Sequence, residues 1–116
     1  MSTLIMIGNI NQYTFANAIL SANEKSKELF DGNNLDKIHV FHTPESIIKL
    51  NSNLGDKDGW KYFLERNYID YSKFIHRTIR INTDKEDEDT LEKFANDIEE
   101  IINSNERIII DLSNVL

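Results

Sequence analysis

The chain has 116 residues, of which 40% are hydrophobic and 28% are charged, and its formal net charge is −7. This length and composition predict one globular domain over residues 1–116 with a core of modest size. The absence of cysteine excludes disulfides, thiolate metal sites and a cysteine nucleophile.

The distribution of charge argues against nucleic-acid binding. Residues 1–80 carry 10 basic and 9 acidic groups, whereas residues 81–116 carry 3 basic and 11 acidic groups. Because there is no basic stripe, we do not expect a partner of duplex nucleic acid. The N-terminus lacks the basic region of a signal peptide, and no stretch approaches the ~20 apolar residues of a membrane span. We therefore expect a cytoplasmic protein without a membrane partner.

The first predicted elements are a strand and a long helix. Residues 4–7 form a short apolar run that ends at Gly8, and a polar loop follows. Thr14 is the expected N-cap of a helix over residues 15–30, which Asp31 and Gly32 end. Apolar residues recur at helical spacing, which predicts one buried face made of Phe15, Ile19, Ala22, Leu29 and Phe30.

A second strand is predicted over residues 37–41, and a helix follows it directly. Thr43 as N-cap and Pro44 at the first helical position are typical of a helix start. Residues 56–75 then hold six of the eleven aromatic residues, with residues 60–66 as a short helix. Two interpretations of this segment stay open: it is part of the core, which is favoured, or it is a partner surface.

The last predicted elements are a strand, an amphipathic helix and a strand. The third strand covers residues 75–82, and the acidic run 84–89 leads into the helix. The fourth strand, residues 107–112, is an apolar run without alternation, which is typical of a strand buried on both faces. No helix follows to cover it, so we expect the N-terminal part of a larger fold, or a piece that a partner covers.

The alternation of strands and helices predicts the fold class. Right-handed crossovers between consecutive strands give an α/β fold with a doubly wound, mainly parallel sheet of about four strands, which is Rossmann-like. In such sheets ligands bind beyond the carboxyl ends of the strands. Small and polar residues follow the first, second and fourth strands, where free backbone N–H groups of the next helix favour an anion. These turns hold Gly8, Asn9, Asn11, Thr43, Asp111, Ser113 and Asn114.

Together these turns resemble the CRISPR-associated Rossmann-fold (CARF) sensor domain. Residues 5–9 (Ile-Met-Ile-Gly-Asn) look like the first-strand motif of that family. Residues 40–46 (Val-Phe-His-Thr-Pro-Glu-Ser) look like its second strand and Thr-Pro-Glu turn, and residues 109–114 (Ile-Ile-Asp-Leu-Ser-Asn) look like its fourth strand. Val115 and Leu116 stand where the family commonly has Gly-Thr-Lys.

The resemblance implies a sensor of cyclic oligoadenylate in CRISPR antiviral defence. Such domains act as homodimers that hold the ring nucleotide across a two-fold axis, without a cofactor or metal. By position, the resemblance implies the ligand contacts Gly8, Asn9, Asn11, Thr43, Ser113 and Asn114. Some members of the family also cleave the ring slowly without metal, so a ring nuclease is an alternative. A flavodoxin-like or receiver-like domain is a further alternative, although residues 8–11 supply no acidic group for a receiver.

The three histidines receive separate interpretations. His42, at the end of the second strand, is either a general base or base-stacking group or, more simply, a partly exposed strand end. We expect His39 to be structural, and His76 has no evident acidic partner nearby in sequence. No two histidines have the spacing of metal ligands. No catalytic residue is therefore assigned.

Overall fold

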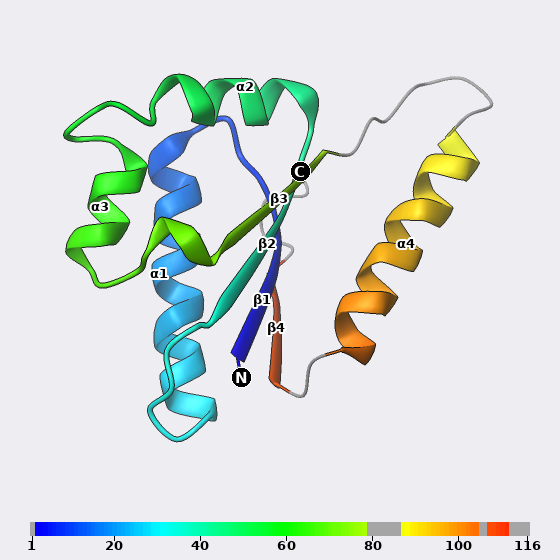
Figure 1. Ribbon diagram of the computed structural model, residues 1–116, viewed down its shortest axis with the longest axis horizontal. Coiled ribbons are helices and arrows are strands. Elements are labelled where there is room, and N and C mark those ends of the chain that lie inside the picture. The colour runs from blue at the N-terminus through cyan, green and yellow to red at the C-terminus, as the bar shows by residue number, and fades with distance from the viewer. Residues whose placement is uncertain (1, 79–86, 105–106, 112–116) are drawn as a thin grey trace.

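The computed structural model describes residues 2–78, 87–104 and 107–111, which form an α/β domain (Figure 1). The strands are β1 (Ser2–Ile7), β2 (Lys37–His42), β3 (Phe74–Thr78) and β4 (Arg107–Asp111). The helices are α1 (Gln12–Leu29), α2 (Pro44–Ser52), α3 (Trp60–Arg66) and α4 (Asp87–Asn103), with a short 3-10 helix, η1 (Tyr71–Lys73).

The sheet is parallel throughout, in the order β3-β2-β1-β4. Helices α1, α2 and α3 lie on one side of the sheet and α4 lies on the other (Figure 1). The predicted doubly wound, parallel, four-stranded fold is confirmed. Because all four strands run in one direction, their carboxyl ends meet at one edge, which we call the carboxyl edge.

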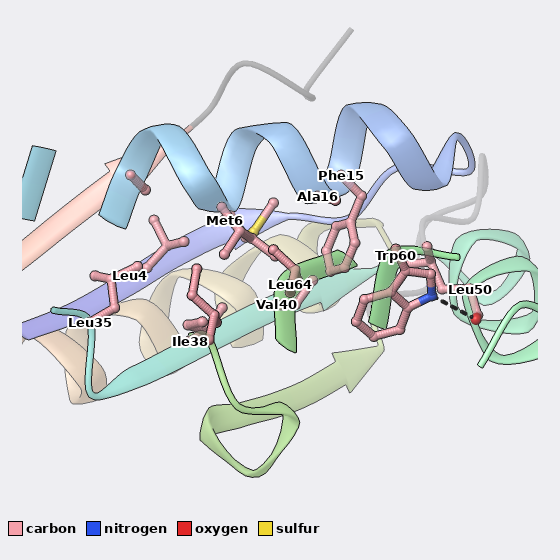
Figure 2. Close-up of a cluster of buried hydrophobic side chains, with 13 residues drawn as sticks. Leu4, Met6, Phe15, Ala16, Leu35, Ile38, Val40, Leu50, Trp60 and Leu64 are labelled. Atoms are coloured by element: carbon pink, nitrogen blue, oxygen red, sulfur yellow. Dashed lines mark hydrogen bonds between the residues drawn. The ribbon is translucent and has the colours of Figure 1, made fainter. Parts of the chain in front are cut away.

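The larger part of the core lies between the sheet and α1. Alternate residues of β1 and β2 face this side because successive side chains of a strand point to opposite faces. The α1 residues that meet them, Phe15, Ala16 and Ile19, are fully buried. In Figure 2 Phe15 and Ala16 of α1 lie over the sheet, and the strand residues of the same cluster include Leu4, Met6, Ile38 and Val40.

A smaller core lies on the α4 side of the sheet. It contains Ile5, Phe41 and Ile101, with Phe94 and Ile98 packed at its margin. The rings of Phe41 and Phe94 meet edge to face at 4.9 Å. This face buries fewer residues than the α1 face, and α1 therefore anchors most of the hydrophobic core.

The aromatic segment is divided between core and surface. Trp60 is fully buried, its ring lies 5.1 Å from that of Phe15, and its Nε1 donates to the carbonyl of Leu50 at 3.0 Å (Figure 2). Tyr68, in contrast, is 90% exposed. The core interpretation is confirmed for Trp60, whereas Tyr68 projects into solvent.

The start of α1 differs from the prediction. The N-cap is Asn11 and not Thr14, because the Asn11 Oδ1 accepts from the backbone N–H groups of Tyr13 and Thr14 at 3.0 and 3.1 Å. Asparagine is among the strongest N-cap residues, so the helix begins three residues earlier. At the other end of α1, Leu29 is 56% exposed, although the spacing placed it on the buried face.

The expectation that the fourth strand is buried on both faces is wrong. Strand β4 is an outer strand of the sheet and has β1 as its neighbour. Most of its residues are half-buried, and Ile110 is 47% exposed. The run of isoleucines reflects the preference of β-branched side chains for strands, and that preference does not require full burial. The predicted third strand ends at Thr78, and residues 79–82 lie outside the described residues.

Candidate functional site

The carboxyl edge brings the ends of three strands together. Met6 of β1 is in register with Asp111 of β4, and Ile7 is in register with Phe41 of β2. The N–H of Gly8 then donates to the carbonyl of Phe41 at 2.8 Å, which places the turn after β1 directly beside the turn after β2. Ser113 and Asn114, the predicted contributions of the fourth strand, lie outside the described residues.

The turn after β1 is built by its own asparagines. The backbone N–H of Asn11 donates to the Oδ1 of Asn9 at 2.7 Å, and the Oδ1 of Asn11 caps α1. Because that oxygen is engaged by two N–H groups, a ligand at Asn11 would meet the Nδ2 amide group. The exposed side chains of Ile10 and Tyr13 flank the turn.

The turn after β2 starts α2 as the sequence predicts. Thr43 is the N-cap, its Oγ1 accepts from the N–H of Ser46 at 3.2 Å, and Pro44 occupies the first turn. Glu45 in the same turn complements the positive end of the helix dipole. Two helix N-termini therefore face the carboxyl edge, and each is capped by a side chain of the protein itself.

The charged side chains of these turns are acidic. Residues 8–12 and 42–46 contain Glu45 but neither lysine nor arginine, and Asp111 lies at the end of β4. Attraction for an anion would come from backbone N–H groups and the helix dipoles. An anion at Ser46 would have to replace the cap bond from Thr43.

No protein-family model matches the chain, and neither a curated protein nor a solved structure matches it. Within the part of the chain that the structure describes, no helix is long and apolar enough to cross a membrane. Among the same residues, no group of three or more histidine, aspartate or glutamate side chains has the arrangement of a metal site.

Directly beneath the carboxyl edge lies a pair of histidines, His42 fully buried and His76 half-buried, that the sequence did not predict. His42 is fully buried, with its Nδ1 3.2 Å from the Ser46 Oγ and its Nε2 2.7 Å from the Nδ1 of His76. The two rings are stacked, with centroids 4.9 Å apart and planes inclined by 28°. Val40 is in register with His76, so the two histidines are diagonal neighbours on one face of the sheet.

This arrangement overturns the interpretation of His42 as an exposed strand end or a catalytic base. Burial, and then the neighbouring His76, lower the pKa of His42 to about 4, and burial also lowers the pKa of His76. His42 is thus neutral at pH 7 and inaccessible to a ligand. His39 faces the α4 side of the sheet and is buried, in agreement with a structural role.

A surface depression lies elsewhere, between α3 and η1. It is lined by Glu65, Tyr68, Ile69 and Asp70. Because η1 leads into the amino end of β3, this depression is remote from the carboxyl edge. The Asp70 carboxylate is engaged there in capping η1, where it accepts from the N–H of Ser72 at 2.9 Å.

Proposed function

We propose that the chain is a nucleotide-sensing domain that binds a cyclic oligoadenylate at the carboxyl edge. One observation carries the proposal: the parallel sheet brings the turn of residues 8–11 and the turn of residues 43–46 to one edge, each at a helix N-terminus. In open α/β sheets this edge is where ligands bind. The resemblance of the same turns to CARF domains supplies the ligand class.

The chemistry of the two turns suits a ligand with phosphates and exocyclic amines. Backbone N–H groups at the starts of α1 and α2 can donate to phosphate oxygens in place of the cap oxygens of Asn11 and Thr43. The Nδ2 group of Asn11 and the hydroxyl of Thr43 then offer further hydrogen bonds. Asp111, an acidic group at the end of β4, is suited to accept from an adenine amine rather than to meet phosphate.

The proposal includes a homodimer in the cytoplasm. A ring of identical nucleotides has rotational symmetry, so a two-fold dimer offers each half of the ring the same contacts. Ring cleavage is not included, because the histidine next to the turns, His42, is buried and cannot reach a ligand.

Isothermal titration of the purified chain with cyclic tri-, tetra- and hexa-adenylate tests the proposal. We expect binding heat with one of the rings, at a stoichiometry of one ring per two chains. Linear tetra-adenylate is the matched control, since it carries the same bases and similar charge without ring symmetry. The absence of heat with all three rings would reject the proposal.

Two substitutions at Thr43 distinguish a binding role from capping alone. Thr43→Ser keeps both the cap and the hydroxyl, whereas Thr43→Val keeps the shape and removes the hydroxyl. If Thr43 contacts the ligand, Thr43→Val weakens binding at least tenfold while Thr43→Ser binds as the wild type does. Equal affinity of the two variants would show that Thr43 is only a cap.

A further inference from the structure

A chain of hydrogen bonds links three elements beneath the carboxyl edge. It runs from Ser46 on α2 through His42 at the end of β2 to His76 on β3. His42 directly precedes Thr43, the N-cap of α2, and Gly8 lies against its ring. The histidine pair therefore sits at the point where both turns of the candidate site are attached to the sheet.

The hydrogen-bond partners define where the protons lie. The Ser46 Oγ lies 3.2 Å from the carbonyl of Thr43 and donates to it, so the same oxygen accepts from the Nδ1–H of His42. The Nε2 of His42 then carries a lone pair and accepts from the Nδ1–H of His76. The remaining nitrogen, Nε2 of His76, is buried with no partner among the described residues. The reverse direction would bury an unpaired N–H donor there, which is the costlier arrangement.

The surroundings of the pair offer little to stabilise a positive charge. Phe15 of α1 and Gly8 of the turn after β1 face His42, while Phe74 of β3 and Tyr71 of η1 face His76.

The titratable and charged groups nearby are few. They are the Tyr71 phenol, the Lys61 ammonium over the Tyr71 ring at 5.4 Å, and Glu45, which is exposed beside Ser46. No described carboxylate forms an ion pair with either histidine.

We propose that His42 and His76 form a pH-sensitive latch, which holds the amino-terminal turn of α2 while both rings are neutral and releases it on protonation. A proton on the Nε2 of His42 would face the Nδ1–H of His76, and the hydrogen bond between the rings would be lost. A proton on His76 would create a half-buried cation whose buried Nε2–H has no acceptor among the described residues. In both cases the rings separate, and the backbone at Thr43 moves with His42.

The latch regulates the candidate site, so its effect on ligand affinity rests on the proposed function. Its effect on the structure of the chain is independent of that function. The unfolded chain takes up protons near pH 6.5, whereas His42 in the folded chain does so near pH 4. Acidification from pH 7 to pH 5 is therefore expected to lower the folding equilibrium constant about 20-fold through His42 alone.

NMR of the ¹⁵N-labelled chain tests the latch without any ligand. At pH 7.5 we expect both imidazoles to be neutral Nδ1–H tautomers, with a ¹⁵N–¹⁵N coupling across the hydrogen bond between them. On acidification, the amide signals of Gly8 and Ser46 should shift together with the protonation of His42. Amide signals that ignore this protonation, or a ring that is charged at pH 7.5, would overturn the latch.

A matched pair of variants separates the latch from general effects of histidine burial. His76→Phe keeps the stack on Phe74, whose ring is inclined to that of His76 by only 10°, but removes the hydrogen bond to His42. In this variant the Ser46 amide signal at pH 7.5 should already resemble that of the acidified wild type. His39→Leu removes the buried imidazole of the other sheet face and should leave the wild-type titration of Ser46 unchanged.

Each outcome of the variants has a meaning. The latch would be rejected if the Ser46 amide signal of His76→Phe, and its change with pH, were the same as in the wild-type protein. If His76→Phe does not fold, the pH titration of the wild-type protein alone tests the latch. With cyclic tetra-adenylate, the affinity of the wild type should fall as the pH approaches the pKa of His42, about 4. A lack of binding at every pH, with the NMR behaviour as expected, would reject the proposed ligand and leave the latch intact.

Discussion

The imidazole of His42 occupies the space that a side chain on Gly8 would need. A Cβ on Gly8 would lie 3.0 Å from the Cε1 and 3.2 Å from the Cγ of His42, closer still to Nδ1, and the ring is fully buried. Gly32 is the glycine with positive φ among the described residues, so the requirement at Gly8 concerns space rather than backbone conformation. The ring of His42 thus accounts for a glycine at position 8, whether or not a ligand binds at the carboxyl edge.

Gly8→Ala is therefore expected to destabilise the fold by about 1–3 kcal/mol, because the added methyl group must displace a buried ring. Urea denaturation monitored by Trp60 fluorescence measures the change. Gly55→Ala is the control, since a Cβ at Gly55 meets nothing within 4 Å and its φ is not positive. That variant should stay within ~0.5 kcal/mol of the wild type. Equal stability of the two variants would contradict the packing of His42 against Gly8.

Trp60 is expected to be a principal anchor of α3. Its ring packs on Phe15, and its indole N–H donates to the carbonyl of Leu50, which ties α3 to both α1 and α2. Trp60→Phe removes the hydrogen bond and leaves a small cavity, so we expect a loss of about 2–3 kcal/mol by chemical denaturation followed by circular dichroism. Tyr62→Phe on the same helix should change stability by less than ~0.5 kcal/mol, since Tyr62 is partly exposed.

Tyr68 holds a backbone conformation that glycine adopts more easily. It has φ 66° at the end of α3, where its N–H donates to the carbonyl of Glu65 and the N–H of Ile69 donates to the carbonyl of Leu64. This is the Schellman arrangement, in which glycine is usual at the left-handed position. Because the ring is 90% exposed, Tyr68→Gly should stabilise the fold by about 0.5–1 kcal/mol in thermal denaturation. Tyr68→Ala removes the same ring without relieving the strain, so a gain in that variant would contradict the explanation.

Ligand binding at the carboxyl edge should depend only weakly on salt. Residues 8–12 and 42–46 hold no lysine or arginine, so phosphate would be bound by backbone N–H groups rather than by ion pairs. We expect the affinity for the bound ring to change less than about threefold between 50 and 300 mM NaCl in isothermal titration. A steep fall would indicate cationic contacts from elsewhere in the chain.

Local signals allowed part of the fold and of the site to be predicted from sequence. Thr43 and Pro44 mark the start of α2 because capping and proline chemistry act within a few residues. The alternation of elements likewise gave the parallel sheet, since crossovers have a fixed hand. The start of α1 was missed because Asn11 and Thr14 are both good caps, and only the turn that Asn9 forms with Asn11 decides between them.

The histidine pair depends on contacts between residues distant in sequence. His42 and His76 become neighbours only when β3 pairs with β2 in a particular register, and a shift of one residue would turn His76 to the other face. Similarly, the position of β4 at the edge depends on the strand order, which the run of isoleucines cannot specify. Both features are tertiary, and no pattern within one strand encodes them.

Stability should fall steeply as the pH drops from about 6.5 toward 4. Burial lowers the pKa values of His39, His42 and His76, and for His39 the positive charges of Arg77 and Lys37 lower the pKa further. Groups whose pKa is lower in the folded state bind more protons when unfolded, so protonation below pH 6.5 favours unfolding, whereas above pH 6.5 their contribution to stability is complete. The His42 shift alone corresponds to about 2 kcal/mol between pH 7 and pH 5, measured by urea denaturation. His39→Leu should reduce the pH dependence of the unfolding free energy only by the part that His39 itself contributes, because His39 lies on the other face of the sheet from His42 and His76. A slope that vanished in this variant would assign the pH dependence to His39 and not to His42 and His76.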